Sequence, residues 1–133
     1  KGKVVSFIYG QGKTDDRIND PDMKEGVLEQ QLDELIKVDG IDSLFIPSDR
    51  LTARAYAYLR HKGVSPSNYT IISCNNEEPY LEGLFPHPAT IEIGAEEIGE
   101  KAVKLLIERM ANKKISSSTD KIEPKLISEF KKY

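Results

Sequence analysis

Short apolar runs alternate with an amphipathic stretch in the middle of the chain. Residues 41–47 form an apolar run without a polar face, as expected of a strand that is covered on both sides, Phe45 included. Residues 51–59 carry apolar side chains at helical spacing, and residues 69–74 form a second apolar run. This pattern predicts two parallel strands joined by a crossover helix.

Helix-capping and turn residues stand at the joints of this unit. Ser48 or Asp49 can cap the helix after Pro47, a role that suits Asp49 better than ligand contact does, and Gly63 ends the helix. Asn75 and Asn76 follow the second strand, where either a turn role or a ligand contact suits them. Open α/β sheets bind ligands beyond the carboxyl ends of their strands. The sequence therefore predicts one rim, which comprises Ser48, Asp49, Asn75 and Asn76.

The sequence of the first third of the chain predicts one more strand and one more helix. Residues 3–9 are β-branched and aromatic between glycines, which favours a strand. Asp20 and Pro21 form a strong helix start, and an apolar stripe runs on to residue 36. The Gly12-Lys13-Thr14 sequence is not interpreted as a phosphate loop, since Phe7 stands where the first glycine of that motif belongs.

The last third predicts a long loop, a helix and a final extended segment. Residues 77–90 are rich in proline, and their length fits a passage between subdomains. A short extended piece at 91–93 precedes an amphipathic helix over 95–111. Residues 112–120 form a linker, and 121–130 are extended. The expected division is an α/β core over 1–88, a crossover and helix over 89–112, and a linker with the last segment over 113–133.

Composition narrows the possible functions. The 133 residues carry a net charge of −3, which argues against this segment itself gripping a nucleic-acid backbone. The single cysteine, Cys74, cannot form an internal disulfide, and no apolar run approaches the ~20 residues of a membrane span, so a cytoplasmic location is predicted. His61 and His87 belong to no catalytic or metal-binding motif. No enzyme activity, metal or cofactor is predicted.

Two stretches together resemble the lactose-repressor/galactose-repressor (LacI/GalR) family of bacterial regulators. They are FIPSDRLTARAYAYLRHKGVSPSNYTIISCNNEE and PHPATIEIGAEEIGEKAVKLLIERM, which match the order and spacing of that family's effector-sensing domain. The resemblance covers nearly the whole chain. It implies an α/β fold with a three-layer, Rossmann-like parallel sheet of the periplasmic binding protein-like type, present as a partial domain.

The resemblance also suggests roles for particular residues. The family's Asn-Asp pair corresponds to Ser48 and Asp49, and its sugar-binding aspartate corresponds to Asn75, with Asn76 next to it. By a looser alignment, Tyr9 takes the place of the aromatic residue that stacks on the ligand. The helix over 51–59 forms the dimer contact in the family, which suggests interface roles for Arg54, Tyr56 and Tyr58. Core packing is an equal alternative for the two tyrosines.

The resemblance implies a domain that lacks some of its parts. The first subdomain and the central strand of the second are missing, so we expect residues 3–9 to dock beside 43–47, or a second chain to fill the gap. The helix over 95–111 normally packs on the missing subdomain, so we expect its apolar stripe to be covered in a homodimer.

The function predicted from sequence is the effector-sensing and dimerising domain of a transcription regulator. It would bind a small polar metabolite such as a sugar, and contact DNA only through a domain outside this chain. An extracytoplasmic sugar-binding protein of a transport system is one alternative. A small flavodoxin-like enzyme is another, because doubly wound sheets host many functions.

Overall fold

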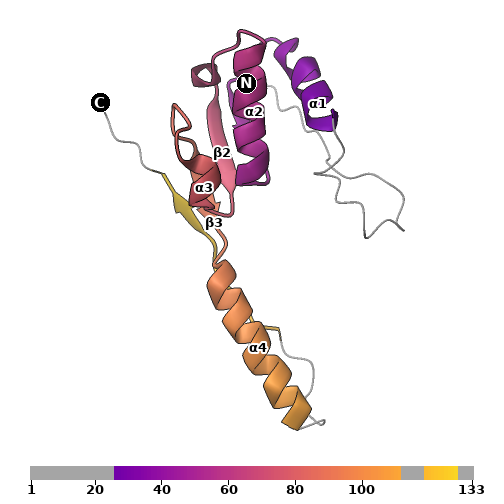
Figure 1. Cartoon of the computed structure of the whole chain (residues 1–133), viewed down its shortest axis with the longest axis vertical. Coiled ribbons are helices and arrows are strands. Elements are labelled where there is room, and N and C mark those ends of the chain that lie inside the picture. The colour runs from indigo at the N-terminus through magenta and orange to yellow at the C-terminus, as the bar shows by residue number, and fades with distance from the viewer. Residues whose placement is uncertain (1–25, 112–118, 129–133) are drawn as a thin grey trace.

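The computed structural model describes residues 26–111 and 119–128, and within them the strands form one mostly parallel sheet (Figure 1). The order in space is the order in sequence: β1 (Ser43–Phe45), β2 (Thr70–Cys74), β3 (Ala89–Glu92) and β4 (Lys125–Ile127). Strand β2 lies parallel to β1 and to β3, whereas β4 returns antiparallel to β3. The predicted parallel pair is thus confirmed, and β4 adds a pairing that the sequence analysis did not predict.

Two helices cover one face of this sheet. Helices α1 (Val27–Ile36) and α2 (Asp49–His61) lie side by side over it (Figure 1). Apolar residues of both helices meet inward-facing residues of β1 and β2, which removes their surface from water. The resulting core contains Leu28, Leu32, Leu35, Leu44, Ile46, Leu51, Ala55, Tyr56 and Ile71.

The opposite face of the sheet is open among the described residues. Phe45 points to this face and is 62% exposed, while Leu44 beside it is buried. Ile72 lies between two buried residues of β2, and Ile91 follows the buried Thr90 of β3, yet both isoleucines are only partly buried. The expectation that β1 is covered on both sides is therefore wrong for this part of the chain. The described residues build two layers of the α/β fold.

Helix α2 begins and ends as its sequence requires. Ser48 has an extended backbone and its side chain accepts a hydrogen bond from the Leu51 amide at 3.3 Å, so Ser48 is the N-cap. A capping role for Asp49 is wrong, because Asp49 is the first residue of the helix. After the helix, Gly63 has φ 73, a left-handed conformation that glycine adopts without steric cost.

The segment after β2 folds back onto α2. It contains the short helix α3 (Glu78–Leu81), whose Leu81 is buried, and a loop with a cis Phe85–Pro86 peptide bond. The Tyr56 hydroxyl donates a hydrogen bond to the Pro86 carbonyl at 2.8 Å, and Arg60 donates to the Phe85 carbonyl at 2.9 Å. The expected passage between subdomains is therefore wrong, because this segment covers α2 within one unit.

Helix α4 (Ala95–Ala111) differs from the other helices. Its bounds match the helix that the sequence predicts over 95–111, yet it extends away from the sheet and has no buried residue (Figure 1). Between α2 and β2 the chain forms one 3-10 turn, η2 (Pro66–Asn68). No helix in the described part of the chain is long and apolar enough to cross a membrane.

Several predictions concern residues outside the described ranges. They are the strand over 3–9, its docking beside β1, the helix start at Asp20 and most of the linker over 112–120. Helix α1 itself begins at Val27, after Gly26 with φ 91.

Candidate ligand site at the carboxyl ends of the strands

The structure brings the four predicted rim residues of the central unit together. Because β1, β2 and β3 are parallel, their carboxyl ends meet at one edge of the sheet. Ser48 and Asp49 follow β1, whereas Asn75 and Asn76 follow β2 directly. We call these four residues the rim. Ser48 and Asn75 are partly buried, Asn76 is exposed, and Asp49 has no exposed surface.

One residue of the rim, Asp49, belongs to a buried hydrogen-bonded cluster. The Asp49 carboxylate accepts hydrogen bonds from the hydroxyls of Ser73 on β2 and Thr90 on β3, the latter at 3.0 Å. The Thr52 hydroxyl lies 2.8 Å from that of Ser73. All four side chains, which we call the Asp49 cluster, are at most 1% exposed. Buried polar groups are tolerated where they are hydrogen-bonded, as these are.

The Asp49 cluster also holds the backbone of the turn after β2. The Glu77 amide donates to the second carboxylate oxygen of Asp49 at 2.6 Å, and the Asn76 amide donates to the Thr90 hydroxyl at 3.2 Å. Since a carboxylate only accepts, the Thr90 hydroxyl donates to Asp49 while it accepts from Asn76. One buried aspartate thus links α2, β2, β3 and the turn.

The side chains of the two asparagines contact carboxylates at the surface. The Asn76 amide group donates to Glu92 at 2.9 Å, and that of Asn75 lies 3.4 Å from a carboxylate oxygen of Glu77. Glu92 also accepts from the Gly94 amide at 2.7 Å. The hydrogen bond from Asn76, followed by that from the Gly94 backbone, lowers the pKa of Glu92. The surface around the rim is therefore polar and negatively charged.

The remaining predicted site residues lie elsewhere or outside the described ranges. Tyr9 lies outside them. Of the three residues assigned to a dimer contact, Tyr56 is buried in the core, with its hydroxyl bonded to the Pro86 carbonyl. Arg54 pairs with Glu29 at 2.8 Å. Tyr58 is partly buried against the core.

Several residues of the site were missed by the sequence analysis, among them Ser73, Thr90 and Glu92. A signal for the first was available. Ser73 shares a strand face with the apolar Ile71, and a polar residue at such an inward position needs a buried hydrogen-bond partner. No such signal marks Glu92, because its contact with Asn76 spans 16 residues and depends on the register of β3.

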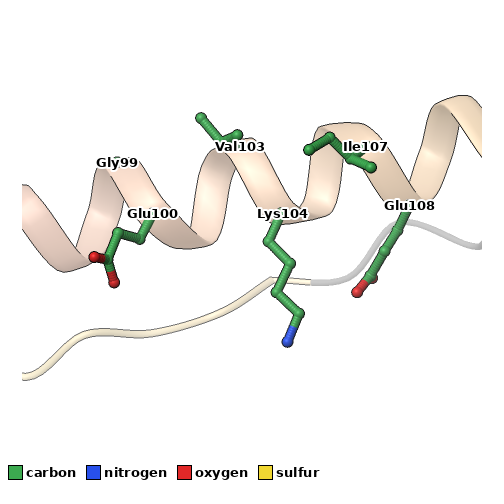
Figure 2. A pocket seen from close by; sticks show the side chains of 6 residues that line it. All are labelled: Gly99, Glu100, Val103, Lys104, Ile107 and Glu108. Carbon is green, nitrogen blue, oxygen red and sulfur yellow. The ribbon is translucent and has the colours of Figure 1, made fainter.

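A separate hollow lies along α4. It measures about 660 Å³ and is lined by Gly99, Glu100, Val103, Lys104, Ile107 and Glu108. Figure 2 shows the three charged side chains on one side of the helix and the two aliphatic ones on another. All lining residues belong to α4, so this hollow contains no part of the rim. Among the residues that the structure describes, no cluster of His, Cys, Asp or Glu could hold a metal ion.

The fold and the rim together define an α/β domain of the kind that binds ligands at strand ends. The sequence profile of the periplasmic binding protein-like domain matches residues 8–128, so the chain belongs to this family. No curated protein matches the chain.

Three solved structures show the same fold. A LacI family transcriptional regulator from Enterococcus faecalis, solved with bound ribose, is 24% identical, has a TM-score of 0.68, and is matched over 76% of this chain and 38% of its own. The complex of the transcriptional regulator CelR with cellobiose is 20% identical, has a TM-score of 0.65, and is matched over 76% of this chain and 30% of its own. A LacI family regulator from Silicibacter pomeroyi is 27% identical, has a TM-score of 0.52, and is matched over 74% of this chain and 29% of its own. The predicted resemblance is confirmed, and the chain spans less than two fifths of each structure.

Proposed function

We propose that this chain is part of the effector-sensing domain of a LacI-type bacterial transcription regulator, without enzymatic activity, acting in the cytoplasm. The observation that carries the proposal is the convergence of three parallel strand ends on one polar rim. This is where open α/β sheets bind ligands. Family membership and the sugar complexes of similar structures support the same conclusion.

The chemistry of the rim favours a neutral, hydroxyl-rich ligand. The amides of Asn75 and Asn76 can each donate and accept, and the Ser48 hydroxyl can donate while its oxygen caps α2. Glu77 and Glu92 lie within reach of the asparagine side chains, so a phosphate group at the rim would meet like charge. Ribose is the first ligand to test, because a structure of the same fold contains it.

Thermal unfolding with and without sugars tests this proposal. The product of the complete open reading frame that includes this chain is heated with ribose, cellobiose or ribose 5-phosphate. A ligand at 100 times its Kd stabilises the folded state by about 2.7 kcal/mol, which is a rise of several degrees in Tm. We expect the neutral sugars to raise Tm more than the phosphate ester does.

Asn75→Ala places the site, and Asn68→Ala in η2 is the matched control at the opposite end of β2. We expect the first variant to lose the sugar response and the second to keep it. An Asn75→Ala protein that responds as the wild type does would remove this side chain from the site. A response to the phosphate ester alone would contradict the proposed neutral ligand.

Dimerisation and DNA binding are further parts of the proposed function. Arg54 and Tyr58 keep some exposed surface on α2, and α4 exposes apolar side chains that a second chain could cover. DNA contact is assigned to a domain outside this chain, since the net charge is −3. Sedimentation of the same samples tests the dimer, and a monomer at all concentrations would contradict it.

A further inference from the structure

The turn that carries the two asparagines has an unusual backbone. Asn75 has φ 104 and Asn76 has φ 59, and both are non-glycine residues in the positive-φ region. Asparagine tolerates a left-handed conformation better than most residues do. Two such residues in a row still persist only where their surroundings determine the conformation.

Three consecutive backbone amides of this turn donate hydrogen bonds to residues of α2 and β3. The Asn75 amide donates to the Ile91 carbonyl at 2.8 Å, as part of the contact between β2 and β3. The next two amides donate to side chains of the Asp49 cluster, that of Asn76 to Thr90 and that of Glu77 to Asp49. The backbone conformation of the turn is therefore determined largely by side chains that lie beneath it.

The position of Asp49 fits a supporting role and not direct contact with a ligand. It has no exposed surface, and both carboxylate oxygens already accept hydrogen bonds. A ligand on the rim would reach the asparagine side chains first. The resemblance assigns Asp49 to the ligand-binding residues, and the geometry points to a different contribution.

We propose that Asp49, Ser73 and Thr90 are positioning residues that hold the Asn75–Asn76 turn in its left-handed conformation and so aim both amide side chains at the ligand. This rests on the proposed function only for the identity of the rim as the ligand site. The three residues come from α2, β2 and β3, so the turn is fixed relative to all three elements.

Amide hydrogen exchange followed by NMR tests the proposal on the chain without ligand. Thr90→Val keeps the shape of the side chain but removes both the donor to Asp49 and the acceptor for the Asn76 amide. We expect exchange at Asn76 to accelerate roughly tenfold relative to the Leu59 amide in α2, since the Asn76 amide loses its acceptor. Exchange at Glu77 should rise less, because its acceptor Asp49 loses only the hydrogen bond from Thr90. Thr90→Ser keeps the hydroxyl, and we expect it to retain the wild-type ratio.

Two further variants separate positioning from general destabilisation. Thr70→Val makes the same chemical change at an exposed position of β2 and should leave the ratio unchanged. Ser73→Ala removes one donor to Asp49 but leaves Thr90 in place, so exchange at Glu77 should rise more than exchange at Asn76. Equal acceleration at the turn and at Leu59 in Thr90→Val would overturn the proposal, as would a wild-type ratio in both Thr90→Val and Ser73→Ala. Because no sugar is present, these outcomes are independent of the thermal test of the proposed function.

Discussion

Helices α2 and α4 are both amphipathic, yet they sit in opposite surroundings. Of the 13 residues of α2, six are buried: Asp49, Leu51, Thr52, Ala55, Tyr56 and Leu59. Of the 17 residues of α4, none is. Helix α2 lies between the sheet, α1 and the loop after β2, whereas α4 extends away from all three (Figure 1).

The contrast shows what an apolar stripe can and cannot establish. A stripe at helical spacing identifies the face that avoids water, but not the surface that covers it. Helix α4 exposes several large apolar side chains, namely Ile98, Val103, Leu106, Ile107 and Met110. Most helical stability in proteins comes from the packing of an amphipathic face and not from helix propensity. Helix α2 finds its covering surface among the described residues, and α4 does not.

A pair of matched leucine deletions gives the largest expected effect. Leu59 in α2 has no exposed surface, whereas Leu106 in α4 is 59% exposed. Leu59→Ala should lower the free energy of unfolding by roughly 2–5 kcal/mol, because it leaves a cavity in the core. Leu106→Ala should change it by less than about 0.5 kcal/mol, as substitutions at exposed sites usually do. Urea unfolding of both variants measures the difference.

The effect of Leu106→Ala depends on whether the protein associates with a second copy. If α4 is covered by a second copy, Leu106→Ala should weaken that association, and its effect should grow with protein concentration. Equal losses for Leu59→Ala and Leu106→Ala at every concentration would show that α4 packs within the chain itself, and the contrast between the helices would fail.

The hydroxyl of Tyr56 provides a smaller test of the enclosure of α2. Burial raises the pKa of Tyr56 to about 12, although nearby Arg60 opposes the shift. The neutral phenol is favoured in the folded state, so its contribution is complete below the unfolded pKa of ~10 and is lost as pH rises through 12. Tyr56→Phe should cost about 1 kcal/mol at neutral pH and should remove this alkaline loss of stability.

Urea unfolding at neutral and alkaline pH measures both effects. Tyr80→Phe, at an exposed tyrosine, is the control at neutral pH and should leave the free energy of unfolding unchanged. If Tyr56→Phe shows the same alkaline loss as the wild type, ionisation of this hydroxyl does not limit stability.

Local signals predicted the elements well and the long-range pairings poorly. The helix over 95–111 and the parallel pair of β1 and β2 followed from periodicity and from the short crossover. The return of β4 onto β3 did not, because Lys125–Ile127 carries no mark of its partner and the pairing joins residues more than 30 positions apart. The open face beside Phe45 was also missed, since an apolar run looks the same whether or not a second layer covers it.

The position of the rim was predictable from the sequence, but its buried hydrogen bonds were not. The rule that strand ends carry ligand residues placed Ser48, Asn75 and Asn76 together without knowledge of any contact. The buried role of Asp49 was not predictable, because it depends on two hydroxyls that lie 24 and 41 residues further along the chain. A helix-start aspartate looks the same in sequence whether it caps its own helix or links three elements.

The smallest expected effects come from removing ion pairs. One pair joins the end of α2 to α1, and the other lies within α4. Lys62, the C-cap residue of α2, lies with its ammonium group 3.0 Å from the carboxylate of Asp33 in α1. Lys101 and Glu97 are four residues apart in α4, and their charged groups lie 2.8 Å from each other. Hydrogen bonds from Lys62 and then Tyr58 lower the pKa of Asp33, and the hydrogen bond from Lys101 lowers that of Glu97. Each contribution is therefore present above the ordinary carboxyl pKa and is lost as pH falls through the lowered one.

The two pairs should differ in what their loss affects. Asp33→Asn should slightly reduce the cooperative unfolding free energy at neutral pH and flatten its dependence on acid pH, because this pair joins two helices of the core. Glu97→Gln should leave that free energy unchanged and reduce only the helical circular dichroism, because its pair supports a single helix. Urea unfolding and circular dichroism of both variants across the acid range measure this. A loss of cooperative stability in Glu97→Gln would mean that α4 unfolds together with the core, which the absence of buried residues in this helix argues against.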